Sequence, residues 1–498
     1  MHRRLARRDR DLLALVRRAV YGNPTSPYRW LLRHAGCEYG DFERLVAREG
    51  VEGALSALLR DGVYLTVEEF KGRRPTVRGG VSRTFSPDAF RNPGAAVHAE
   101  VHSGGSRGAR TAVGVDLDGV REEAADLCLW LHAREAAASV AAIWTIPGSA
   151  AIRILLRMSA AGTRPVAWFS QVDPGGRDLH PRYRWSARVV AWGSRLAARP
   201  LPYPRHVPLE DPLPVGRWMA EVRRAGRIPH LQTYPSAAAH LCRRIADAGL
   251  DVSGAQFVLA GEPVTPARLA AVRAVGAHAA SSYSTIEAGN VAYGCLAPAG
   301  ADDLHVLHDL HAVIQPGRGA PDALPADALL LTSLRPTAPL VLLNAAPGDR
   351  ATVLAGSCGC AVERTGWTTR LQDVRSYEKL TAGGMTFLDV DVARVLDEVL
   401  PARCGGGPTD YQLVEDETPE GRPRLRLLVA PSVGPLDERA AVDVFLTALG
   451  GASGAERVME RLWRSGAFVG VERAVPRTTP GGKILHLHRS TPATAGRA

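Results

Sequence analysis

The sequence predicts an α/β protein in which a large N-terminal domain, built of α/β subdomains, precedes a small α+β domain. Its 498 residues exceed what one hydrophobic core usually organises, so two or three domains are expected. From about residue 95, short apolar runs alternate with helical patterns, which is typical of an α/β sheet with covering helices. Near residue 370 this alternation ends. We therefore expect domains at residues 1–372 and 373–498.

The first 90 residues or so have the pattern of helices. Apolar residues recur at helical spacing in DLLALVRRAV (11–20) and FERLVAREGVEGALSALLRDG (42–62). The segment LTVEEF (65–70) combines Thr66 with Glu69 three residues later, the capping pattern of a helix start. We expect a short capped helix there.

Strands and helices alternate through the middle of the chain. The short apolar runs that we read as strands are ASVAAIWTIP (138–147), RPVAWFSQV (164–172), ARVVAWG (187–193), AQFVLAG (255–261) and DALLLTSL (327–334). Helices such as SAAAHLCRRIADAG (236–249) and PARLAAVRAVG (266–276) lie between them. The C-terminal region should contain helices at 389–400, 438–449 and 456–466 and strands near 410–416 and 422–431.

The net charge of +10 suits nucleic acid, an anionic membrane surface or an anionic substrate. Acidic residues are interleaved with the arginines, and no basic and aromatic stripe marks a nucleic-acid module. No segment approaches the ~20 uncharged apolar residues of a membrane span, and the basic N-terminus lacks a signal peptide's apolar core. The seven cysteines are scattered and odd in number, which does not suggest a disulfide framework. We expect a cytoplasmic protein.

A glycine-rich stretch, EVHSGGSRGARTAV (100–113), follows an apparent strand. Such a loop can turn backbone N–H groups and serine hydroxyls towards phosphates, although a surface loop has the same composition. The Gly-Lys-Ser/Thr ending of a Walker loop is missing. The candidate phosphate-binding residues are Ser103, Gly104, Gly105, Ser106 and Gly108.

Lysine is rare in this chain. Only three of the 61 lysines and arginines are lysine, and one of them, Lys483, follows two glycines in VPRTTPGGKILHLHR (475–489). Lysine offers a compact charge on a slender stem, whereas the guanidinium of arginine is a broad planar fork. A site that needs a point charge would retain lysine, although a surface lysine that escaped replacement is the simpler reading.

Four more stretches complete an ordered series: LAGEPVTP (259–266), SSYSTIEAG (281–289), PGDRATV (347–353) and TTRLQDVRSYEKLTAGG (368–384). With the glycine-rich loop and the Lys483 segment, this series resembles the adenylate-forming acyl and aryl acid ligases, most of all the phenylacetate–CoA ligase branch. The resemblance covers the chain from about residue 40. It implies that ATP and Mg²⁺ activate a carboxylic acid as an acyl-adenylate, and that the acyl group then passes to a thiol, with CoA the default acceptor.

The resemblance implies a role for each matching residue. The glycine-rich loop would hold the β and γ phosphates, and Tyr283 would lie against the adenine. Asp349 would bind the ribose hydroxyls, for which a two-oxygen acceptor is suited, and Glu287 would hold Mg²⁺. The adenine-edge segment matches Gly261, Glu262 and Pro263. Taken one at a time, the acids could instead cap helices or turns.

The remaining roles belong to the mobile C-terminal domain and its hinge. Arg370 would reach the ribose and phosphate side, and Asp373 falls near the hinge. Lys483 would neutralise the substrate carboxylate and the α-phosphate during adenylation. The family then swings this domain, which makes Lys379 a candidate for the second conformation.

The tyrosine motif departs from the family's Tyr-Gly-x-Thr-Glu. Ser284 replaces the glycine, and Ile286 replaces the hydroxyl residue before Glu287. One phosphate contact is therefore lost or is supplied by Ser284 or Thr285. This departure affects the expected rate and the expected substrate more than the expected class of reaction.

A Cys-x-Cys step and an upstream cysteine suggest a zinc site. Three thiols, Cys295, Cys358 and Cys360, with the imidazole of His305 would suit tetrahedral Zn²⁺, and members of the phenylacetate branch look similar. His308 and His311 compete with His305, and three simply reduced cysteines are the alternative. Four protein ligands would make the zinc structural.

Three functions remain in competition. The first is an acid–AMP ligase that makes an acyl-CoA, with an aryl or similar acid as substrate. The second transfers the same adenylate to a carrier-protein thiol or to an amine. The third is a catalytically weak binding relative, which the altered tyrosine motif motivates. A homodimer is one option for assembly.

Overall fold

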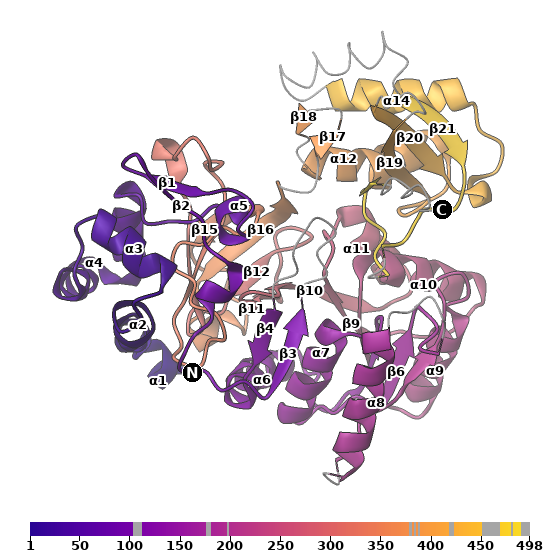
Figure 1. Cartoon of the computed structure of the whole chain (residues 1–498). Coiled ribbons are helices and arrows are strands. Elements are labelled where there is room, and N and C mark those ends of the chain that lie inside the picture. Colours follow the sequence, from indigo (N-terminus) through magenta and orange to yellow (C-terminus); the bar gives the residue numbers. More distant parts are fainter. Residues whose placement is uncertain are drawn as a thin grey trace, which may run out of the picture.

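The computed structural model describes residues 1–102, 112–175, 181–196, 199–377, 381–382, 385–386, 389–417, 423–450, 469–479 and 482–489. Figure 1 shows a large body from which a smaller C-terminal unit, containing β19, β20 and β21, stands apart at the top. Among the described residues, no helix combines the length and the hydropathy needed to cross a membrane.

The N-terminal region is helical, as the sequence predicts. The capping box is present: Thr66 Oγ1 accepts from the Glu69 N–H at 3.2 Å, and the Glu69 carboxylate accepts from the Thr66 N–H at 2.9 Å. The helices are α1 (His2–Leu5), α2 (Arg8–Val16), α3 (Pro27–His34), α4 (Tyr39–Arg60) and α5 (Val67–Phe70). A hairpin of β1 (Thr76–Arg78) and β2 (Val81–Arg83) follows them.

A ten-stranded sheet forms the centre of the body, in the order β15-β16-β12-β11-β10-β9-β8-β5-β6-β7. From β10 to β7 all neighbours are parallel, and from β10 to β15 all are antiparallel. The parallel half comprises β5 (Val140–Trp144), β6 (Ala167–Ser170), β7 (Pro204–His206), β8 (Pro229–Thr233), β9 (Gln256–Ala260) and β10 (His278–Thr285). The antiparallel half adds β11 (Gly289–Gly294), β12 (Leu304–Val306), β15 (Asp349–Ala355) and β16 (Thr369–Ser376).

Helices connect the parallel strands, so the predicted α/β class is confirmed. These helices are α7 (Ser149–Ala160), α8 (Pro181–Leu196), α9 (Leu213–Arg224), α10 (Pro235–Asp247) and α11 (Pro266–Arg273), and α6 (Leu117–Ala133) precedes β5. Two smaller hairpins pair β3 (Ala99–His102) with β4 (Ala112–Val115) and β13 (His311–Ile314) with β14 (Leu330–Ser333).

One expected strand is wrong. The run ARVVAWG (187–193) belongs to α8, because its large apolar residues recur at helical rather than alternating spacing together with Trp185 and Leu196. Its side towards the body is lined by the small residues Ala187 and Ala191, which are buried.

The C-terminal unit has its own sheet, in the order β21-β20-β19-β22, and its own buried apolar cluster between Val392 and Leu487. The elements are α12 (Asp389–Arg394), α13 (Leu400–Cys404), β19 (Tyr411–Glu417), β20 (Pro423–Val429), α14 (Glu438–Gly450), β21 (Val469–Arg473) and β22 (Leu487–Arg489), with a short hairpin of β17 (Thr381–Ala382) and β18 (Met385–Thr386) before them. The helix expected at 456–466 lies outside the described residues. The division that we predict at 372/373 falls inside β16, where Asp373 has a φ of +54°, unusual for a residue other than glycine.

Candidate functional site

Lys483 lies against the large body, although it belongs to the C-terminal unit. Its Nζ is 5.6 Å from the ring centroid of Tyr234. A Cβ added to Gly261 would lie 3.1 Å from this Nζ and 3.3 Å from the Tyr234 ring. Gly261 also has a φ of +85°, so the close approach and the backbone conformation both favour glycine there.

The loop that carries Lys483 is closed on itself. The Thr479 N–H donates to the Lys483 carbonyl at 2.9 Å, and the Lys483 N–H donates to Thr479 Oγ1 at 3.2 Å. Gly482 has a φ of +69°, and a Cβ there would collide with Gln171 and approach Ile146 to 2.9 Å. Gly482 therefore allows a tight loop to enter between the two units.

The carboxylate of Glu262 is the anchor of this loop. It is fully buried and accepts from the Ile484 N–H at 2.9 Å, directly after the lysine. It also accepts from the Ser236 N–H and Oγ, each at 2.9 Å, and from Arg268 Nη1 at 3.1 Å. Because three of these donors belong to the body, Glu262 is held in place whether or not the lysine loop is present.

A second buried carboxylate, Asp397, joins the units from the other side. Arg268 Nε forms an ion pair with Asp397 Oδ2 at 2.9 Å, and both side chains are at most 1% exposed. The same oxygen accepts from Thr265 Oγ1 at 2.8 Å and lies 3.0 Å from His486 Nε2. Burial opposes the ionisation of Asp397, but the charges of Arg268 and His486 outweigh it and hold the pKa of this carboxyl below its usual range.

A more exposed ion pair lies at the edge of the same contact. Arg243 of α10 donates to Asp410 Oδ2 at 2.9 Å, with the arginine side chain 34% exposed. The contact between the two units thus has a buried ionic centre and a more exposed ion pair at its edge.

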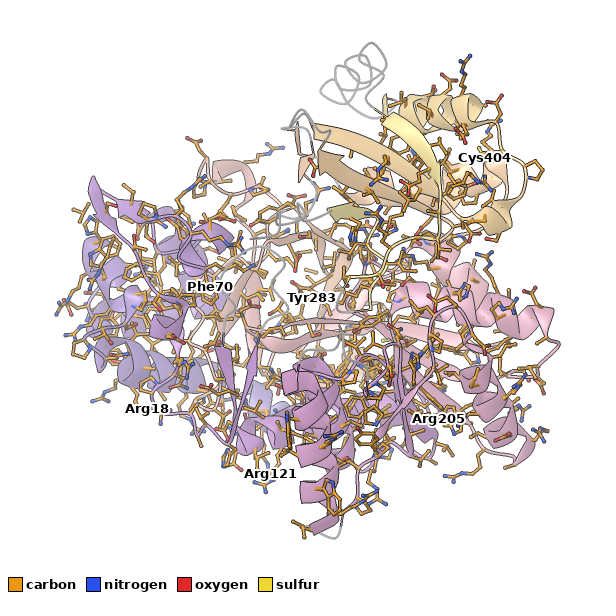
Figure 2. The ribbon with its side chains drawn as sticks, turned by 45° about the vertical axis from the view of Figure 1, so that its right-hand side comes forward. Arg18, Phe70, Arg121, Arg205, Tyr283 and Cys404 are labelled. Atoms are coloured by element: carbon orange, nitrogen blue, oxygen red, sulfur yellow. The ribbon has the colours of Figure 1, made fainter. Side chains whose placement is uncertain are left out.

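Tyr283 and Asp349, predicted to flank the nucleotide, are in direct contact. The Tyr283 hydroxyl donates to Asp349 Oδ2 at 2.8 Å, which joins β10 to β15. Burial and the Asp349 charge raise the pKa of Tyr283 well above its usual value, so it remains a donor. Figure 2 places Tyr283 near the centre of the molecule, below the C-terminal unit.

Glu287 and Thr285 line a small cavity beside this pair. Lys71, at the end of α5, and Pro347, before Asp349, line the same cavity. Thr285 Oγ1 accepts from the Ala288 N–H at 3.0 Å, which orders the turn around Glu287. Lys71 was not singled out by the sequence, although lysine is rare enough in this chain to have marked it.

Arg370 is not brought to Asp349. Along β16, Ser376 pairs with Asp349, whereas Arg370 pairs with Leu354 near the other end of β15. Six residues of strand separate the two positions, roughly 20 Å. Arg370 Nη1 donates to the buried Asp303 at 2.7 Å.

The arginine at the Asp349 end of β16 is Arg375. It pairs across the strands with Arg350, next to Asp349, and Arg375 Nη1 donates to Asp302 Oδ2 at 2.7 Å. Asp302 also accepts from the N–H of Asp373, which supports the left-handed turn in β16.

Several predicted residues lie outside the described part of the chain: Ser103, Gly104, Gly105, Ser106, Gly108 and Lys379. The positions that flank the glycine-rich loop, His102 and Ala112, are paired in the β3–β4 hairpin. Ser284 lies at an irregularity in the β10–β11 register, and the Pro263 carbonyl is 3.5 Å from Arg268 Nη1.

Cys295, His305, Cys358 and Cys360 form a compact cluster, in which all ligand atoms lie within 4.8 Å of one another. His305 Nε2 is 3.5 Å from Cys358 Sγ and 3.3 Å from Cys360 Sγ, and the Cys295 and Cys358 sulfurs are 3.6 Å apart. Tetrahedral zinc with its usual bond lengths would separate such ligands by about 3.4–3.8 Å. The four side chains therefore fit zinc.

The orientation of His305 supports this fit. Its Nδ1 faces the Trp367 carbonyl at 2.6 Å, which leaves Nε2 to the cluster, as in most metal-bound histidines. Burial lowers the pKa of His305 and favours the neutral ring that a metal needs. The two competing histidines have other partners: His308 Nε2 accepts from the Thr369 N–H at 3.2 Å, and His311 Nε2 faces the Asn290 carbonyl at 3.0 Å.

Two residues near the lysine loop had no sequence signal. Arg268 is one arginine among many, and its burial follows from a contact with Asp397, distant in sequence. Gln171, after β6, has both amide atoms buried without a hydrogen-bond partner in the described structure. Trp168 and Phe169 of β6 are core residues.

No family model matches the chain, and no curated protein matches it. Solved structures of 2-hydroxyisobutyryl-CoA ligase do match. In the postadenylation state, with R3-HIB-AMP, that enzyme is 14% identical, with a TM-score of 0.55 over 98% of this chain and 89% of its own. In the thioesterification state, with 2-HIB-AMP and CoA, it is 16% identical, with a TM-score of 0.50 over 98% of this chain and 90% of its own. The chain therefore has the fold of the adenylate-forming ligase superfamily.

Proposed function

We propose that this protein activates a carboxylic acid as an acyl-adenylate and then transfers the acyl group to a thiol, with CoA as the acceptor. The observation that carries the proposal is the position of Lys483, which the C-terminal unit delivers to Gly261 and Tyr234. Both residues directly follow parallel strands, β9 and β8. Ligands of α/β sheets bind at these carboxyl ends, so the lysine enters where a substrate is expected.

Each residue then acts on a defined part of the reaction. The Lys483 ammonium neutralises the approaching carboxylate and the α-phosphate oxygens, two anions that would otherwise repel each other. Asp349 accepts from the ribose hydroxyls, and Tyr283 stays on one side of the base through its bond to Asp349. Glu287 would hold Mg²⁺, which neutralises phosphate charge when bound.

The arginine of the site is better assigned to Arg375 than to Arg370. Arg375 lies at the Asp349 end of β16, whereas Arg370 is held by Asp303 beside the cysteine cluster. Arg375 is itself paired with Asp302, so it would orient the turn at Asp373 as well as face the ribose side.

The C-terminal unit would move about the turn at Asp373, with the domains divided near residue 372. The contact at Arg268 suits repeated opening. When the units separate, Glu262 keeps Arg268 on the body, and Asp397 keeps His486 on the C-terminal unit. Neither buried carboxylate is then left without a donor, so opening avoids the largest cost of breaking a buried ion pair.

The cysteine cluster would hold a structural zinc. It joins the end of β11 and strand β12 to the loop after β15, on the Arg370 side of the sheet. Four protein ligands leave zinc no open position, so it would shape this end of the sheet without taking part in the reaction.

The test is a pyrophosphate-exchange screen over aryl, heteroaryl and aliphatic acids, with ATP and Mg²⁺. The proposal expects exchange with at least one acid and product formation when CoA is added; aryl acids of the phenylacetate type are the first to test. Product only with a holo-carrier protein or an amine would overturn the CoA assignment. No exchange with any acid would favour a binding relative, the reading that Ile286 motivates.

A further inference from the structure

Helix α8 exposes its large apolar residues and buries its small ones. Trp185, Val189, Trp192 and Leu196 recur at helical spacing and are 64%, 64%, 65% and 88% exposed. Ala187 and Ala191, on the side towards the body, are buried. A helix that packs only within its own protein shows the reverse arrangement, so this face is built to contact something else.

The positive charge of α8 indicates that its partner is anionic. The segment 181–196 contains four arginines and no aspartate or glutamate. Two of them, Arg188 and Arg195, are exposed and lie 5.8 Å from the ring centroids of Trp185 and Trp192. Tryptophans and arginines exposed together on one helix are typical of helices that lie in the interface of an anionic membrane.

The position of α8 allows such contact. In Figure 1, α8 descends to the lower edge of the molecule, opposite β19 to β21 of the C-terminal unit. A surface that met α8 would leave the Lys483 loop and the moving unit facing away from it. A second copy of this chain is a poorer occupant, because two arginine-bearing helices would repel each other.

We propose that α8 docks this protein on an anionic lipid surface. Trp185, Val189, Trp192 and Leu196 would enter the headgroup–acyl boundary, and Arg188 and Arg195 would pair with lipid phosphates. The binding is reversible and peripheral, and it weakens as salt screens the arginines.

Co-sedimentation of the full-length protein with vesicles tests the proposal. We expect binding to mixed phosphatidylglycerol–phosphatidylcholine vesicles and little to pure phosphatidylcholine. Each arginine near an anionic surface changes binding roughly fivefold, so Arg188→Glu/Arg195→Glu should weaken it by about 25-fold or more. Trp185→Ala/Trp192→Ala should also release the protein. The matched control is Arg403→Glu/Arg439→Glu, the same charge change at exposed positions of the C-terminal unit.

All four positions of the two α8 variants are exposed, so unfolding should be unchanged, and a thermal melt verifies this. Failure of the native protein to bind anionic vesicles at low salt would overturn the proposal. So would equal binding by the tryptophan variant, or an equal loss in the control. Sedimentation velocity tests the alternative that a second copy of this chain binds to α8. A dimer that the tryptophan substitutions abolish would assign the exposed face to that second copy.

Discussion

The backbone N–H of Ile484 donates a 2.9 Å hydrogen bond to the buried carboxylate of Glu262, and this bond joins the lysine loop to the body of the protein. Lys483 directly precedes Ile484, so the bond to Glu262 restricts the position of the Lys483 backbone and thereby of its ammonium group. The segment that contains Glu262 was expected to border adenine. Its side chain accepts from the backbone of the lysine loop, and we infer that Glu262 is a positioning residue for Lys483.

Glu262→Gln should therefore slow adenylation more than acyl transfer. A hydrogen bond to a charged group contributes about 1.5–3 kcal/mol, so pyrophosphate exchange should fall roughly 10- to 100-fold. The rate of thioester formation from supplied acyl-adenylate should change little. Ser236→Ala is the matched control, because it removes one donor from the same carboxylate without touching the loop. Equal losses in both half-reactions would indicate a general defect.

Lys483→Ala should abolish adenylate formation while preserving the second half-reaction. Removing one charged group that stabilises a transition state costs at least about 100-fold. Lys483→Arg should also fail, because the space against Gly261 and Tyr234 admits a slender stem and not a planar fork. Single-turnover assays with ATP, and separately with synthetic acyl-adenylate and CoA, distinguish the steps. Normal adenylation by either variant would refute the assignment.

Short local patterns predicted the residues whose signals are local. Thr66 with Glu69, and Cys358 with Cys360, needed only spacing and residue type, and the structure brings each pair together. Lys483 stood out because lysine is rare in this chain, whereas Gly261 was singled out only through the resemblance to the ligase family.

Contacts between residues that are distant in the sequence could not be predicted from such local patterns. Arg268 meets Asp397 across more than a hundred residues, and arginine is too common here to mark a buried position. Arg370 matched a motif, yet the register of β16 against β15 places Arg375 near Asp349. The run 187–193 looked like a strand because its apolar residues are clustered, whereas its exposed face follows a helical period.

Asp397→Asn should weaken the contact between the units and thereby slow adenylation. Breaking a buried ion pair costs about 3–5 kcal/mol, although Glu262 still neutralises Arg268 here. We expect pyrophosphate exchange to fall about tenfold or more and small-angle scattering to report a more extended average shape. Arg243→Gln, which breaks the exposed pair with Asp410, should change exchange less than about fivefold. The reverse ranking would contradict a buried ionic centre.

Cys360→Ser should remove the metal and lower the thermal stability. Losing one ligand should weaken zinc binding by at least about 100-fold, more than changes beyond the ligands usually do. The native protein should contain one zinc per chain by elemental analysis, and the variant much less. Cys128→Ser, at a cysteine on α6 outside the cluster, should retain zinc and melt normally. Zinc-free native protein with an unchanged melting temperature after chelation would refute the site.

The last prediction concerns pH and His311, which is 5% exposed on β13. Burial lowers the pKa of His311 to about 4, below the unfolded value of about 6.5. The folded state therefore keeps the ring neutral where the unfolded state takes up a proton. The stability from this group is complete above pH ~6.5 and is lost as the pH falls towards 4.

The difference between the folded and unfolded pKa values of His311 sets the size of the effect on stability. Between pH 7 and pH 5 the free energy of unfolding should fall by about 2 kcal/mol through this residue alone. His311→Gln, which can still donate to the Asn290 carbonyl, cannot take up that proton. Its free energy of unfolding, measured in urea at both pH values, should therefore decline by about 2 kcal/mol less than that of the native protein. Equal declines would show that His311 is protonated alike in both states, which its burial opposes.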